Sequence, residues 1–90
     1  MGLRMEKLNI NLNNFEEVIN TLIFNDYSFY LTEKNGDEFF VSRMGGEDIL
    51  FYKMRNYDIS QNCSKRLTRK QLIAYKDNVK DITVIREMIE

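Results

Sequence analysis

Histidine, proline and tryptophan are absent from this 90-residue chain, and Cys63 is its single cysteine. A structural zinc site needs four ligands, mostly Cys and His, so the sequence excludes one. A Ser–His or Cys–His catalytic pair is excluded because no imidazole is available as a base. The remaining catalytic candidates are carboxylates between residues 33 and 48, weak evidence without His or metal-ligand spacing. We therefore predict a protein that is not an enzyme and that holds no metal or other cofactor.

Glycine-rich loops and long apolar runs are also missing. The four glycines match neither of the phosphate-loop patterns, G-x-G-x-x-G and G-x-x-x-x-G-K. The longest apolar runs, at residues 49–52 and 72–75, are far shorter than the roughly 18 residues that a membrane helix needs. The first residues lack the apolar core of a signal peptide. We expect a cytoplasmic protein without a membrane segment.

Size and composition predict one small domain over residues 1–90. The chain is 43% hydrophobic and 30% charged. Domains of about 100–150 residues are the norm, which leaves no room for two. The apolar and aromatic content is too high for a disordered chain.

Two segments have the sequence pattern of helices. In the first, apolar residues recur at i, i+3, i+4, i+7 and i+8, namely Phe15, Val18, Ile19, Leu22 and Ile23. We predict a helix over residues 15–25, with Asn14 as its N-cap and Glu17 completing a capping box. Thr68 and Gln71 form a second capping box, before a helix predicted over residues 69–78.

Between these helices the sequence predicts a β-meander. Residues 27–34, 37–44 and 47–55 are rich in aromatic and β-branched side chains, and Asn-Gly and Gly-Gly pairs separate them. With two-residue turns, Glu38 faces Lys53 across the second hairpin. In the same register Arg43 faces Asp48, and Glu33 faces Glu38 across the first hairpin. The last pair is unfavourable, and a longer first loop would remove it.

The remaining segments complete the expected architecture. Residues 8–12 alternate as a short strand, residues 1–7 are expected to be flexible, and residues 56–67 read as a long polar loop. In residues 81–90 the β-branched run favours a strand, but isoleucine spacing favours a helix, which we assign. The predicted fold class is α+β: an N-terminal helix packed on a three- to four-stranded antiparallel β-meander, with one or two C-terminal helices.

The net charge of −1 conceals an uneven distribution. Residues 1–52 hold four basic and nine acidic side chains, whereas residues 53–80 hold eight basic and two acidic ones. The basic segment over residues 65–80 predicts an anionic partner, such as nucleic acid or a carboxylate-rich protein. Pairing with the acidic half of the same molecule would explain the same charges. The candidate contacts from this segment are Arg66, Arg69, Lys70, Lys76 and Lys80.

Both faces of the predicted sheet are apolar and aromatic. In the register above, Tyr30, Phe39 and Tyr52 lie on one face of neighbouring strands, where they are candidates for partner binding or for stacking on bases. A C-terminal helix packed over this face would instead bury it. A homodimer closing over the face is a third explanation.

These observations lead to two functional hypotheses. The first is a small non-enzymatic protein-binding module, an inhibitor or accessory protein of a phage or mobile element that occludes a host macromolecule such as a nuclease. Its support is the small size, the surplus aromatic surface, and ten Asn, nine Ile and seven Lys, which are typical of AT-rich coding sequences. The second is a nucleic-acid-binding protein or regulator that uses the basic segment over residues 65–80.

Overall fold

The computed structural model describes residues 2–43, 48–56 and 58–88. Within these residues the fold is mixed α+β, with one antiparallel seven-stranded sheet and two α-helices. In chain order the elements are β1 (Gly2–Leu8), α1 (Phe15–Phe24), β2 (Phe29–Glu33), β3 (Glu38–Arg43), β4 (Ile49–Arg55), β5 (Asp58–Ile59), β6 (Lys65–Leu67), α2 (Arg69–Ala74), a 3₁₀ turn (Lys76–Asn78) and β7 (Val79–Met88).

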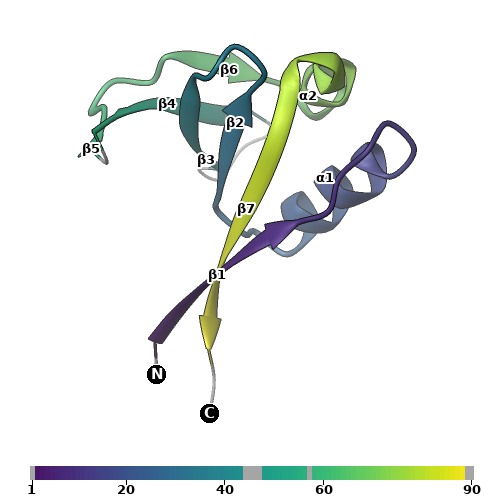
Figure 1. Cartoon of the computed structure of the whole chain (residues 1–90), viewed down its shortest axis with the longest axis horizontal. Coiled ribbons are helices and arrows are strands. Elements are labelled where there is room, and N and C mark those ends of the chain that lie inside the picture. The colour runs from purple at the N-terminus through teal and green to yellow at the C-terminus, as the bar shows by residue number, and fades with distance from the viewer. Residues whose placement is uncertain (1, 44–47, 57, 89–90) are drawn as a thin grey trace.

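The two ends of the described chain lie side by side in the sheet. The strand order is β1-β7-β2-β3-β4-β5, and β6 pairs with β4. Figure 1 shows β1 and β7 crossing at the bottom of the view, where they extend beyond the other strands toward the two termini. The last strand of the chain therefore lies inside the sheet, between the first strand and the β2–β4 meander.

The helix predicted over residues 81–90 is wrong over its described part, because residues 79–88 form strand β7, and residues 89 and 90 lie outside the described residues. Its β-branched run places Ile82 and Val84 on the buried face, both fully buried, and leaves Thr83 on the other. Alternation with period two thus describes this segment better than the helical spacing of its isoleucines.

Two other segments form more strand than the sequence suggested. Residues 2–7, expected to be flexible, form strand β1 together with Leu8. The strand predicted over residues 8–12 is wrong beyond Leu8, because residues 9–12 lie outside any strand. The polar segment 56–67 contributes β5 and β6, both paired with β4. These additions raise the sheet from the expected three or four strands to seven within the described chain.

The two predicted helices are present, but only one has the predicted cap. Thr68 Oγ1 accepts from the Gln71 amide and Gln71 Oε1 accepts from the Thr68 amide, so the capping box of α2 is confirmed. At α1 the predicted box is wrong, since Asn14 makes no side-chain capping bond. Its side chain instead accepts from the Asn11 amide and donates to the Asn9 carbonyl, which ties the preceding loop together.

Both hairpin registers differ by one residue from the prediction. The Glu33 amide donates to the Asp37 carbonyl, which closes a three-residue loop containing Gly36 at φ +97°. A left-handed conformation of this kind favours glycine. In the second hairpin Arg43 lies opposite Ile49, so its predicted pairing with Asp48 is wrong.

The observed register sorts the meander into one buried and one uncovered face. Core residues from α1 and α2 pack on one face of the sheet, and Figure 1 shows both helices on the same side of it. A one-residue slip exchanges the faces of an entire strand. The buried hydrophobic residues that form the core are Phe15, Ile19, Leu22, Phe29, Leu31, Phe39, Val41, Ile49, Phe51, Leu72, Val79, Ile82 and Val84.

Candidate functional site

An aromatic ladder crosses the uncovered face of the sheet, which we call the open face. Tyr30, Phe40 and Tyr52 lie directly opposite one another on β2, β3 and β4. Their ring centroids are 5.8 Å apart between Tyr30 and Phe40 and 6.4 Å apart between Phe40 and Tyr52. All three side chains are half-buried, because the rings cover one another's edges while part of each remains in contact with solvent.

Apolar side chains continue the open face on both sides of the ladder. Alternation along the strands places them on this face, and the outermost two are well exposed: Met5 at 60% and Ile59 at 42%. The others are half-buried. The set consists of Met5, Leu50, Met54, Ile59 and Ile85.

The charged side chains of the open face balance. Among the described residues, Lys7 and Arg66 contribute positive charge, and Glu38 and Asp81 contribute negative charge. Lys7 Nζ lies 3.4 Å from Asp81 Oδ1 across the β1–β7 pair. The open face is therefore aromatic at its centre, and these four described side chains contribute equal numbers of positive and negative charges.

The structure corrects one of the three aromatic site residues. Tyr30 and Tyr52 lie on the open face as predicted, but Phe39 is 3% exposed and points into the core. The residue between the two tyrosines is Phe40, which the two-residue turn had placed on the other face. The Glu33–Glu38 clash in that register was the available signal, because the three-residue loop removes it.

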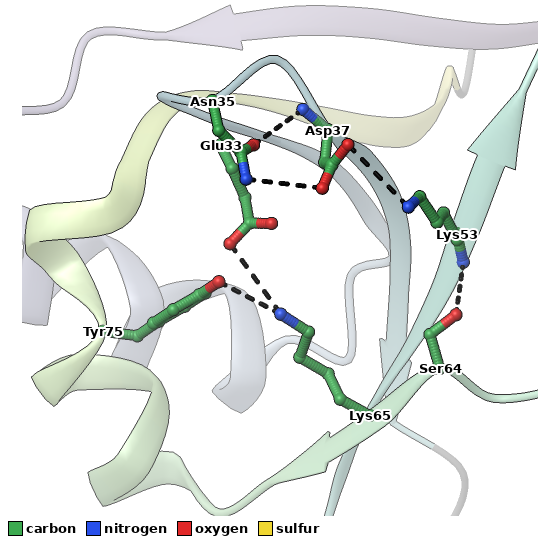
Figure 2. A network of polar contacts seen from close by, with 7 residues as sticks. All are labelled: Glu33, Asn35, Asp37, Lys53, Ser64, Lys65 and Tyr75. Atoms are coloured by element: carbon green, nitrogen blue, oxygen red, sulfur yellow. Dashed lines mark hydrogen bonds and ion pairs between the residues drawn. The ribbon is translucent and has the colours of Figure 1, made fainter.

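A half-buried cation, the ammonium of Lys65, lies on the opposite face of the sheet, on the side of α2. Lys65 Nζ is 3.8 Å from Glu33 Oε2 and donates a 3.0 Å hydrogen bond to Tyr75 Oη, as Figure 2 shows. The ammonium also lies 4.7 Å from the ring centroid of Phe39 and 4.8 Å from that of Tyr75. Glu33 is only 6% exposed, so this arrangement satisfies a buried carboxylate and holds β6 against the core.

The predicted basic residues do not form one patch. Arg66 points to the open face opposite Leu50. Arg69 and Lys70 lie at the start of α2, where Arg69 Nη1 donates to Asn20 Oδ1 of α1 at 2.9 Å. Lys76 and Lys80 line a separate depression that includes Lys34 and Leu12. The structure thus divides the segment over residues 65–80 among three surfaces.

Sequence reasoning missed a second group of surface residues between the two helices. A depression of about 900 Å³ beside α1 is lined by Phe24, Arg43 and Arg69 together with Glu16 and Glu17. Phe24 is 89% exposed, the most exposed of the large hydrophobic side chains in the described chain. Arg43 Nε lies 3.5 Å from Asp26 Oδ1. Cations and carboxylates therefore line the same surface.

The described residues contain neither a metal-type cluster of three or more His, Cys, Asp and Glu side chains nor a helix with the length and apolar character needed to cross a membrane. Cys63 is half-buried, and its thiol donates to the Lys65 carbonyl at 3.1 Å.

Comparisons of the chain with protein-family models, with curated proteins and with solved structures gave no match.

Proposed function

We propose that the chain is a non-enzymatic protein-binding module and that the open face is its docking surface. The observation that carries this proposal is the aromatic ladder of Tyr30, Phe40 and Tyr52, which no described helix covers. Exposed apolar patches rimmed by polar groups mark interaction sites in soluble proteins. Aromatic side chains are also the residues most enriched at the centres of protein interfaces.

The charge balance of the open face supports a protein partner over nucleic acid. Proteins that stack bases on a sheet combine the aromatic platform with a surplus of Lys and Arg that neutralises phosphate. Here Lys7 is paired with Asp81, and Glu38 offsets Arg66. A partner with an apolar surface of its own fits such a face. An inhibitor acting by occlusion, including one from a phage or mobile element, is the form of this function that the small size favours.

The test makes the same change, from Phe to Ser, at one position on each side of the sheet. Phe40→Ser removes the central ring of the ladder, whereas Phe24→Ser removes an exposed ring from α1 on the helical side. Tagged protein is used to capture partners from a nuclease-treated lysate of the source organism or its host, and the captured protein is then purified and titrated. We expect a stoichiometric complex that Phe40→Ser weakens at least tenfold and Phe24→Ser leaves unchanged. Equal binding by both variants would contradict the proposal.

A second candidate function is nucleic-acid binding, which the position of Arg43 favours. Arg43 lines a depression together with Arg69 and Lys70. It adds a third cation to these two residues, which the sequence predicted as contacts. Binding should weaken steeply with added salt. Arg69→Ala and Lys70→Ala should weaken an electrophoretic shift, and Arg66→Ala, on the open face, serves as the matched control. Absence of a shift at low salt excludes this function.

A further inference from the structure

The free edge of β1 is the one long open edge in the described sheet. At the other end of the strand order, β4 is covered by β5 and β6, which are only two and three residues long. Very short edge strands are a usual protection against edge-to-edge pairing. β1 is seven residues long, contains no proline and pairs with β7 on one side alone.

The hydrogen-bond pattern shows which peptide groups of β1 face this edge. The Ile85 amide donates to the Ser28 carbonyl at 3.0 Å, so the peptide groups of Ile85 point toward β2. Met5 lies opposite Ile85. Since peptide groups alternate sides along an antiparallel strand, those of Met5 point away from β7, to the free edge. The peptide groups of Leu3 and Lys7 point the same way.

The sequence of β1 is complementary to itself about Met5. When two copies of β1 pair antiparallel with Met5 at the centre, Arg4 of each copy lies opposite Glu6 of the other. This register also pairs the whole strand, Gly2 with Leu8 and Leu3 with Lys7. Moving the centre to Arg4 or Glu6 puts like charges opposite each other and shortens the overlap.

We propose that β1 pairs with β1 of a second copy of the chain, in the register centred on Met5. Leu3, Met5 and Lys7 then exchange backbone hydrogen bonds with their partners in the antiparallel pattern. The two sheets become one continuous sheet, and the two Met5 side chains, each 60% exposed in the single chain, meet on the open face. The proposal does not depend on what the open face binds.

Charge exchange provides the sharpest test of this register. Sedimentation equilibrium of the full chain should give a dimer that Arg4→Glu and Glu6→Arg each weaken about tenfold or more, because each places like charges opposite each other twice. An equimolar mixture of the two variants should dimerise as the unchanged chain does, since every such pair is then opposite in charge. The double variant Arg4→Glu/Glu6→Arg should dimerise as well.

A backbone test accompanies the charge test. Met5→Pro removes an amide that points to the free edge, so it should abolish the dimer while the far-UV circular dichroism melt stays near that of the unchanged chain. Met5→Leu is the matched control and should keep the dimer. A monomer at about 100 μM of the unchanged chain overturns the proposal. A dimer that survives Met5→Pro, or a variant mixture that fails to pair, overturns it too.

Discussion

Lys65 Nζ lies 3.8 Å from Glu33 Oε2, and this pair joins strand β6 to the end of β2. Glu33 is 6% exposed, and the Lys65 ammonium lies among the rings of Phe39, Phe51 and Tyr75. The contact therefore has a buried acid on one side and a partly exposed cation on the other. Its stability contribution rests on the cost of leaving Glu33 without a partner.

Lys65→Met is expected to lower the free energy of unfolding by about 2 kcal/mol, because it strands Glu33 in the core. The value is below that of a fully buried pair because the Lys65 side chain is 32% exposed. The matched control is Lys53→Met, whose pair with Asp37 is exposed on both sides and should contribute less than about 0.5 kcal/mol. Urea unfolding of both variants measures the difference. Equal decreases in the free energy of unfolding of the two variants would show that the Glu33–Lys65 contact contributes no more than an exposed pair.

Phe39→Ala and Phe40→Ala should differ strongly although the two residues are adjacent. Phe39 is 3% exposed and packs on Phe51, so its loss should cost about 3 to 5 kcal/mol. Phe40 lies on the open face, and its loss should cost about 1 to 2 kcal/mol. Thermal or urea unfolding of both variants decides between the two registers. The register with two-residue turns exchanges the faces of Phe39 and Phe40, so it predicts the larger loss of stability for Phe40→Ala.

Gly36→Ala should destabilise the first hairpin by about 1 to 2 kcal/mol. Gly36 has φ +97°, and an added Cβ would meet nothing within 4 Å, so the cost comes from the backbone conformation alone. Gly36→Asn should cost less, because Asn tolerates left-handed conformations better than Ala. Urea midpoints of the two variants provide the measurement. A loss of stability with Asn as large as that with Ala would contradict the explanation from backbone conformation.

Thr68→Ala should lower stability by about 1 kcal/mol through loss of the capping bond to the Gln71 amide. Thr68→Ser keeps the hydroxyl and should cost much less. Since Gln71 Oε1 accepts from the Thr68 amide, Thr68→Ala and Gln71→Ala should be less than additive. Chemical unfolding of the single and double variants checks this, and full additivity would show that the two bonds act independently.

Local signals in the sequence predicted local structure well. The apolar stripe from Phe15 to Ile23 and the Thr68–Gln71 box each depend on residues a few positions apart, and both are found in the structure. The α+β class and the hairpin meander follow from the same short-range patterns. At the site, Tyr30 and Tyr52 lie together on one face as the alternation of their strands indicated.

Non-local pairing decided the features that the sequence did not predict. The register depends on whether the Asn35–Gly36 turn has two or three residues, and that single residue determines whether Phe39 or Phe40 joins the ladder. Similarly, the segment containing Ile82 becomes a strand because β1 and β2 pair with it on both sides. Arg43 meets Asp26, and Lys65 meets Glu33, only after the chain has folded.

The interior position of β7 has a consequence for folding during synthesis. In the described sheet β1 and β2 are joined only through β7, whose residues follow those of the other six described strands. Until those residues leave the ribosome, β1 has no described strand of its own chain to pair with, and Ile82 and Val84 are missing from the core. Assembly of the complete sheet must therefore await synthesis of residues 79–88, and a nascent chain stopped before residue 79 is expected to remain open to proteases and chaperones.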